Sequence, residues 1–200
     1  MATQNENRVR IVIIPGSVRS GNFTAKAVSL VADEITRYGD IELEVINMDT
    51  LELPLPGREG DPVALKQFRD TVSAATGVIF ATPEYHGTFS ALTKLAIENL
   101  GFPSVLAGKP IALLGVAAGA IGAIKSLEQL RGVCSHVGAI VLPAPVSVAG
   151  VQGVFDEQGQ CTDEMIDKRI RHVATNLIDY INDHICPGIG LEEIVRTSDH

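Results

Sequence analysis

The sequence predicts a three-layer α/β fold, in which a five-stranded parallel sheet is covered by helices on both faces. Short aliphatic, mostly β-branched runs alternate along the chain with longer segments whose apolar residues recur at helical spacing. Strands that alternate with helices in this way indicate a parallel sheet. Because the 200 residues contain no internal repeat, low-complexity stretch or linker, we expect a single domain over residues 1–200, with polar tails at 1–8 and 187–200.

The expected strands are the short apolar runs at residues 8–15, 41–46, 77–81, 111–116 and 139–142. The first run reads RVRIVIIP and stops at a proline and a glycine, which suits a buried strand. The second alternates apolar and acidic residues, so we expect it nearer the edge of the sheet. The other three read GVIFA, IALLGV and AIVL.

Helices are expected to begin near residues 23, 62, 90, 124 and 162. The first carries its apolar side at Phe23, Ala27, Leu30, Val31 and Ile35. Gly39 is expected to end this helix, and Pro62 suits the first turn of the second. Thr162 is a suitable N-cap for the last helix, since two acidic residues follow it in the first turn.

Five strands joined in this way suit the flavodoxin-like order 2-1-3-4-5. In such a sheet, ligands bind beyond the carboxyl ends of the strands, at the point where the strand order reverses. That point lies between the first and third strands, so the loops at residues 16–24 and 82–88 should meet there. These two loops also have the most unusual composition in the chain.

The loop at residues 16–24 reads GSVRSGNFT, which is typical of a phosphate site. Its glycines allow a tight backbone, and its small polar side chains are Ser17, Ser20, Asn22 and Thr24. Arg19 adds a fork of donors that matches a phosphate, and the loop opens a helix whose first amides favour an anion. We expect one terminal phosphate here. The alternative is a serine-rich helix cap with a solvated arginine.

Other phosphate and nucleophile motifs are absent from the sequence. No G-x-x-x-x-G-K-[ST] occurs, which disfavours a P-loop nucleotide hydrolase. The first loop also lacks G-x-G-x-x-G, which disfavours a dinucleotide site, and Ser17 does not lie in the G-x-S-x-G of a hydrolase elbow.

The loop at residues 82–88 reads TPEYHGT. Pro83 and Gly87 would fix its shape, while Tyr85 and His86 could offer planar contact to a flat conjugated ring. The alternative is a surface turn with an exposed tyrosine. After the fourth strand, GVAAGAIG consists of small residues, so either a ligand approaches this backbone closely or the loop packs a helix on the sheet.

These loops resemble those of the NADPH-dependent FMN reductase family, which includes chromate, quinone and azo-dye reductases. Residues 16–19 (GSVR) resemble the family's phosphate loop, and residues 83–88 (PEYHGT) resemble its isoalloxazine loop. Residues 108–110 (GKP) and 119–122 (GAIG) also match in kind. The chain departs from many members where it reads NFT at 22–24 in place of SFN, and where His86 replaces an asparagine.

The resemblance implies FMN bound without a covalent bond. The implied phosphate contacts are Ser17, Arg19, Asn22, the backbone of Phe23, and Thr24. The implied ring contacts are Pro83, Glu84, Tyr85, His86 and Gly87, with Gly119 near them. Hydride would pass from NADPH or NADH through FMN to a quinone, an azo compound, free flavin or a metal oxyanion such as chromate. No side chain is expected to act as a catalytic acid, base or nucleophile, and no metal site is expected.

Three other functions stay open at this point. One is a regulatory or scaffold protein that has lost its flavin, although the intact loops argue against it. A flavodoxin would carry electrons without turning over a nicotinamide, although flavodoxins usually have a T-x-T-G-x-T loop and an aromatic cover, often tryptophan. This chain has Arg19 in that loop and no tryptophan. A flavin reductase would release reduced FMN to a monooxygenase, and its motifs are nearly the same.

Charge and composition limit the remaining partners. A net charge of −8 argues against nucleic acid, and no apolar stretch reaches the length of a membrane span. The three cysteines form no C-x-x-C pair and the first residues are polar, so we expect a cytoplasmic protein. The loop at residues 48–61 is rich in leucine and proline. We expect these leucines to be exposed and then covered by a neighbour in a homodimer or homotetramer. The alternative is that they cap the edge of the protomer's own sheet.

Overall fold

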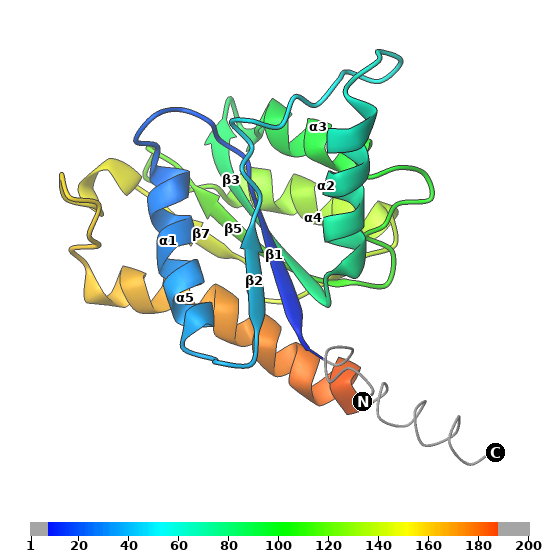
Figure 1. Cartoon of the computed structure of the whole chain (residues 1–200). Coiled ribbons are helices and arrows are strands. Elements are labelled where there is room, and N and C mark those ends of the chain that lie inside the picture. The colour runs from blue at the N-terminus through cyan, green and yellow to red at the C-terminus, as the bar shows by residue number, and fades with distance from the viewer. Residues whose placement is uncertain (1–7, 188–200) are drawn as a thin grey trace.

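The computed structural model describes residues 8–187 and confirms the three-layer α/β fold (Figure 1). The strands are β1 (Arg10–Pro15), β2 (Glu42–Val45), β3 (Gly77–Tyr85), β4 (Thr88–Phe89), β5 (Pro110–Val116), β6 (Ile140–Val141) and β7 (Val146–Val148). The α-helices are α1 (Phe23–Thr36), α2 (Pro62–Ala74), α3 (Ala91–Asn99), α4 (Ile124–His136) and α5 (Glu164–Tyr180). The predicted tails lie outside the described residues except for Arg8 and Pro187.

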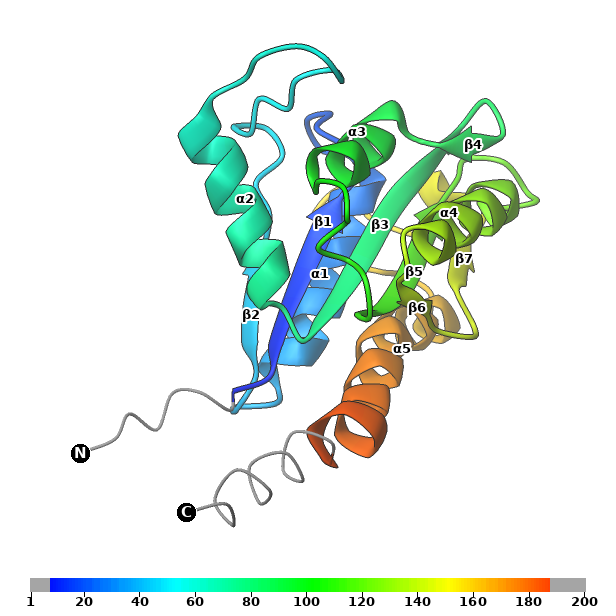
Figure 2. The same cartoon turned by 90° about the vertical axis from the view of Figure 1, so that its right-hand side faces the viewer.

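The sheet has the order β2-β1-β3-β5-β6. This is the predicted order 2-1-3-4-5, because β5 and β6 are the fourth and fifth parallel strands. Figure 2 shows α1 and α5 on one face of the sheet and α2, α3 and α4 on the other. The two faces of β1 explain its unbroken apolar run: Ile11 and Ile13 are buried with α1 and α5, whereas Val12 and Ile14 are buried with α2 and α3.

The fifth strand is divided in two, and sequence reasoning missed its second half. β6 pairs with the start of β5, and β7 pairs with its end. Between them, Pro143 and Pro145 lack backbone donors, and Ala144 takes a positive φ of 58°. The prolines therefore interrupt the ladder, and the strand resumes toward the end of the sheet where ligands are expected.

β3 is longer than predicted, since it continues through Pro83 to Tyr85. Pro83 still has a register partner on β5, and β4 folds back on β3 as a hairpin. His86 and Gly87 form its two-residue turn with positive φ values of 52° and 78°, as a type I′ turn requires. The segment predicted as a loop is therefore a strand end and a tight turn.

Helix ends follow capping chemistry, with two corrections. The side chains of Asn22, Asp61, Ser90 and Asp163 accept backbone amides at the starts of α1, α2, α3 and α5. Asp163 thus replaces the predicted Thr162, whose hydroxyl donates to Val154 O at 3.2 Å. Gly39 is not the end of α1, because Arg37 is already its C-cap.

The leucines of the loop at residues 48–61 were expected to be exposed, and that expectation is wrong for Leu51 and Leu53, which are half-buried. Leu51 and Leu53 pack against the core beneath α2 and α3, and Met48 is buried. Asn99 Nδ2 donates to Pro54 O at 3.0 Å and ties the loop to α3. Only Leu55 of the three leucines stands out, with 65% of its surface exposed.

Lys109, from the GKP segment, ties the start of β5 to the end of α2, at the end of the sheet opposite the carboxyl ends of the strands. Its Nζ donates to Ser73 O at 2.8 Å and to Ala75 O at 2.6 Å, at the carboxyl end of α2. Burial lowers the pKa of this ammonium, and the helix carbonyls favour its charge. The GKP segment, which resembles the family at residues 108–110, therefore makes a structural contact. It lies far from the loops at the carboxyl ends of the strands.

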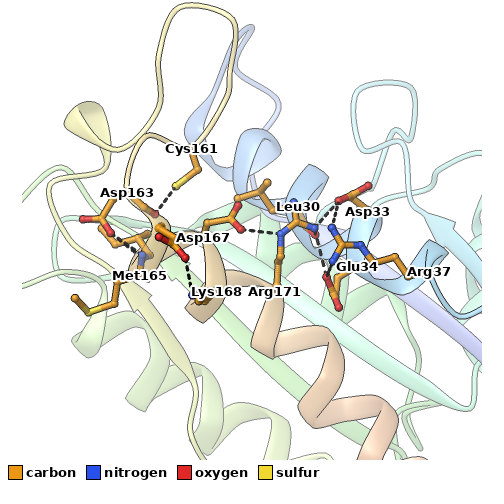
Figure 3. A network of polar contacts seen from close by, with 12 residues as sticks. Leu30, Asp33, Glu34, Arg37, Cys161, Asp163, Met165, Asp167, Lys168 and Arg171 are labelled. Atoms are coloured by element: carbon orange, nitrogen blue, oxygen red, sulfur yellow. Dashed lines mark hydrogen bonds and ion pairs between the residues drawn. The ribbon is translucent and has the colours of Figure 1, made fainter.

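A network centred on Arg171 joins α5 to α1 (Figure 3). Arg171 Nε pairs with Asp167 at 2.8 Å, and its Nη1 reaches Asp33 and also Glu34 at 3.4 Å. Arg37 pairs with the same two α1 carboxylates. The Arg171 guanidinium holds the pKa of the Asp33 carboxyl below its ordinary value of 3.8, mainly through their hydrogen bond.

Arg171→Leu should lower the free energy of unfolding by about 1–3 kcal/mol, the range for hydrogen bonds to charged groups. The low end is expected, because Asp33 is 55% exposed and solvent screens its charge. Since the Asp33 pKa is depressed on folding, its contribution is present above pH 3.8 and is lost as the pH falls through the folded-state pKa.

Urea unfolding at neutral pH and at pH values below the folded-state pKa of Asp33 would measure this difference. Lys168→Ala, which breaks an exposed pair with Glu164 on the same helix, should change stability by less than about 1 kcal/mol. Equal losses of stability in Arg171→Leu and Lys168→Ala would contradict the prediction that the Arg171 network stabilises the fold more than an exposed ion pair does.

Candidate functional site

The two predicted loops meet at a cavity of about 340 Å³ beyond the carboxyl ends of β1, β3 and β5. From the predicted set, it is lined by Ser17, Arg19, Asn22, Phe23, Thr24, Pro83, Glu84 and Tyr85. The wall also includes Ser20 and Gly21, residues 116–118 at and after the end of β5, and residues 151–152. The two loops therefore meet at the switch in strand order, as the topology predicted, and the roles of these residues toward a ligand stay predictions.

Gly16 fixes the first loop against β3 and α3. Its amide donates to Ala81 O at 2.6 Å, and its carbonyl accepts the Ser90 hydroxyl at 2.6 Å. A Cβ at this position would overlap the Thr93 hydroxyl and crowd that of Ser90. Glycine is therefore required here by close approach rather than by an unusual φ.

A buried cluster of hydroxyl groups forms the support below Gly16. Ser90 Oγ lies 2.9 Å from Thr93 Oγ1, which donates to Thr82 Oγ1 at 3.2 Å, and Thr82 Oγ1 accepts the Ser90 amide at 3.1 Å. All three side chains are buried. Sequence reasoning assigned them no role, although three hydroxyl residues around a predicted helix start were a usable signal.

Asn22 both shapes the loop at residues 16–24 and caps α1. Its Oδ1 accepts the Ala25 amide at 2.7 Å, and its Nδ2 donates to Arg19 O at 2.6 Å. Gly21 allows the intervening turn with a φ of 63°. The side chain of Asn22 is therefore engaged within the loop, and residues 22–24 at the start of α1 line the cavity, where the first amides of a helix favour an anion.

The Ser17 hydroxyl is buried without a hydrogen-bond partner in the described part of the chain, which is the clearest indication of a ligand in this site. Within residues 8–187, its Oγ is the one buried side-chain polar atom without a hydrogen-bond partner. Buried polar atoms are almost always paired in folded proteins. Because this hydroxyl lies in the cavity wall at the start of the loop, its missing partner is best explained by a polar ligand.

Arg19 and Tyr85 connect the two loops across the mouth of the cavity. The guanidinium carbon of Arg19 lies 5.3 Å from the centre of the Tyr85 ring, a cation–π distance. Both side chains are exposed. The positive charge is therefore held at the entrance, where it can attract an anion.

A second cavity of about 310 Å³ adjoins the first. It is lined by Glu84, His86, Gly87 and residues 117–122, and it shares Glu84, Ala117 and Ala118 with the first cavity. His86, Gly87 and Gly119 line this second space and not the first. The predicted site residues thus divide into two neighbouring groups joined at Glu84.

Glu84 turns its carboxylate toward α4. Its Oε2 accepts the Ser126 amide at 3.1 Å and the Ser126 hydroxyl at 3.2 Å. The N-cap residue of α4, Ala123, provides no side-chain cap. Ser147 of β7 accepts the Ala123 amide at 2.8 Å. Side chains from two strands therefore supply the capping that this helix lacks.

The tip of the hairpin is also held by α4. Gln129 Nε2 donates to Gly87 O at 3.0 Å, and the Thr88 hydroxyl donates to Gln129 Oε1 at 2.7 Å. This reciprocal pair fixes the backbone of the turn and leaves His86 exposed. Sequence reasoning missed Gln129, because no local pattern links it to a turn 41 residues away.

Val151 and Gln152 were also missed. They belong to a 3₁₀ turn (Val151–Gly153) in a stretch without periodicity. The Val151 amide donates to Ala117 O at 3.0 Å, and the Gly150 amide donates to Gly119 O at 3.2 Å. The interrupted fifth strand thus brings this turn against the loop after β5.

Other candidate chemistries find little support in residues 8–187. Burial raises the pKa of the Cys134 thiol to about 12, so it is not a nucleophile. The three cysteines are free, and the described side chains form no metal-binding group of three. The described helices also lack the length and apolarity needed to cross a membrane.

Comparison with known proteins places the chain among flavin reductases. Residues 9–153 match the family of NADPH-dependent FMN reductases. An NAD(P)H-dependent FMN reductase of Pseudomonas aeruginosa is 31% identical over 163 residues, covering 78% of this chain and 86% of the relative. An NADPH azoreductase of Bacillus sp. is 30% identical over 175 residues, covering 86% and 94%.

Solved structures agree on the fold. The flavoenzyme FerB, an NAD(P)H:acceptor oxidoreductase of Paracoccus denitrificans, superposes with a TM-score of 0.73 at 23% identity, over 88% of this chain and 98% of that one. A flavodoxin from the domain Archaea gives 0.62 at 12% identity, over 87% and 99%. At these identities the structures support the fold alone.

Proposed function

This chain belongs to the NADPH-dependent FMN reductase family, and we propose that it passes hydride from a nicotinamide nucleotide, through non-covalently bound FMN, to small quinones and azo compounds. Membership makes it an FMN-dependent oxidoreductase. The acceptor classes come from relatives named NADPH azoreductase, 2-hydroxy-1,4-benzoquinone reductase and quinone reductase.

The residues of the first cavity fit the phosphate of FMN. The unpaired Ser17 hydroxyl is the observation that carries this assignment, since a phosphate oxygen can accept from it. The amides that open α1 favour an anion, and Arg19 stands at the entrance with a guanidinium suited to phosphate. Thr24 lies buried in the same wall, and Asn22 and Phe23 place the backbone of the turn.

The ring of FMN would lie along residues 83–87, beside the loop that contains Gly119. When bound, FMN accepts hydride and passes electrons on, so the chain needs no acid, base or nucleophile of its own. The small residues after β5 leave room for a planar group, and the clamped hairpin offers backbone groups in fixed positions. His86, where many relatives have asparagine, would face the acceptor side.

Two other functions use the same motifs. A flavodoxin-like carrier shares the fold with this chain, but the relatives named above are reductases. A flavin reductase that releases reduced FMN is the stronger alternative, because the family carries that description. We propose retained FMN, with one domain over residues 1–200 in the cytoplasm, where the free thiols would stay reduced.

We also propose a homodimer, formed through a groove between α3 and α4. The groove encloses about 900 Å³ and is lined chiefly by Phe89, Ile97, Phe102, Val133 and Val137. Phe102 is fully exposed beside it. In a twofold pair, each Phe102 could enter the groove of the other copy. Lys94 and Glu98 border the same groove, so facing copies could also exchange ion pairs.

Purified protein should oxidise NADPH or NADH when a quinone is added, and it should contain FMN rather than FAD. Loss of nicotinamide absorbance measures the turnover, and chromatography of the extracted flavin identifies the cofactor. Gel filtration without added FMN would separate the two reductase mechanisms, because only retained flavin stays with the protein. Bound FMN together with no consumption of NADPH or NADH after a quinone is added would indicate an electron carrier instead.

Arg19→Ala should weaken FMN binding by about 1–3 kcal/mol, the value of a hydrogen bond to a charged group. Ser17→Ala should cost about 1 kcal/mol. Flavin titration of the apo-protein measures both. Arg58→Ala removes an exposed arginine outside the cavity and should leave the affinity unchanged; equal affinities for all three variants would refute the phosphate site.

Phe102→Asp should convert the dimer to a monomer of 21.2 kDa, because the substitution removes the apolar contacts of the ring and adds the cost of desolvating a carboxylate. Phe102 has no buried surface in the isolated chain, so folding should be retained. Leu55→Asp changes the other exposed residue considered for assembly and should leave the dimer intact. Light scattering that finds the wild type monomeric, or Leu55→Asp alone dissociated, would contradict this interface.

A further inference from the structure

We infer that the negative charge of the Glu84 carboxylate keeps the reduction potential of bound FMN low. Glu84 lines both cavities, and hydrogen bonds from Ser126 hold its carboxylate in place. The inference rests on the proposed placement of the flavin ring along residues 83–87. It concerns a side chain that the reaction itself does not require.

Glu84 is well placed for this role. It lines both cavities, and within residues 8–187 it is the one acidic residue that lines either. Its backbone is fixed in the ladder, where Glu84 pairs with Phe89 of β4. The two hydrogen bonds from Ser126 then hold Oε2 at the first turn of α4. Neither the backbone nor the carboxylate is free to move away from the cavity wall.

The surrounding charges determine how strongly this carboxylate acts. The first turn of α4 carries partial positive charge, and it already faces Glu84 through the Ser126 amide. The cations nearby are Arg19, which stacks on Tyr85 at the mouth, and Lys125, whose side chain lies beside Gly87. Among the described aspartates, glutamates, lysines and arginines, only Glu84 and Arg19 line either cavity, so without Glu84 the remaining charge in the walls is positive.

Charge balance gives the direction of the effect. Hydride delivers two electrons and one proton, so the flavin gains one negative charge on reduction, and the nicotinamide is oxidised in return. A neighbouring carboxylate repels that added charge. It therefore favours the oxidised cofactor, lowers the potential, and makes electron transfer to an acceptor more favourable.

Glu84→Gln tests the inference, because the amide keeps the shape and can still accept from Ser126 while the charge is lost. We expect the two-electron midpoint potential of bound FMN to rise by about 30 mV, which corresponds to a tenfold change in the ratio of the dissociation constants of reduced and oxidised FMN. Dye-equilibrated spectrophotometric titration of the holoprotein measures it. An unchanged potential would overturn the inference.

Two further variants separate charge from architecture. Glu128→Gln removes one negative charge from an exposed position on the same helix, and the potential should stay at the wild-type value. An equal rise in that variant would reduce the effect to net charge and overturn the inference. Ser126→Ala removes one compensating hydrogen bond but keeps the carboxylate, so the potential should fall.

Ser126→Ala also decides the matter if Glu84→Gln fails to fold or to retain FMN: a fall supports the inference, and no change overturns it. A wild-type protein that binds no FMN would defeat the proposed function and this inference together. A wild type that binds FMN and reduces quinones, with potentials unmoved in the variants, would defeat the inference alone.

Discussion

The site depends on the close approach of Gly16 to the buried hydroxyl cluster below it. One hydrogen bond from its amide to β3 and one to its carbonyl from Ser90 bring the end of β1 against the start of α3. Because Gly16 is fixed, the loop that follows it places Ser17 in the cavity wall. The same loop places the start of α1 at the cavity. A side chain at Gly16 would separate these elements, so the position of the whole loop follows from the absence of one Cβ.

The second loop is held in a different way. Backbone pairing fixes β3 and β4, and side chains then bind both to α4: Glu84 to the first turn, and the hairpin tip to Gln129. Both loops are therefore held by hydrogen bonds within the protein itself, and such preorganisation reduces the entropy lost on binding. The Arg171 network also anchors α1, the helix that follows the loop at residues 16–24.

Sequence reasoning predicted the strand order and the meeting of the two loops, because apolar periodicity and parallel topology are nearly local properties. It failed where long-range contacts override local signals. Pro83 looked like a loop residue, yet it lies in β3 because its register partner on β5 is a sheet interior position. Leu51 and Leu53 looked exposed, since nothing in their loop indicates that it folds back over the core. Val151 and Gln129 join the site through contacts that no motif records. The roles of the individual residues toward FMN stay predictions.

The stacking of Arg19 on Tyr85 has an optical consequence. The chain contains no tryptophan and three tyrosines, of which Tyr85 alone lines the cavity. Intrinsic emission therefore comes from a very small number of phenols, without an indole to mask them. Any molecule that enters the mouth and displaces the guanidinium alters the surroundings of one of these phenols. The unmodified protein thus carries its own fluorescent reporter of occupancy, placed at the entrance by the same contact that joins the two loops.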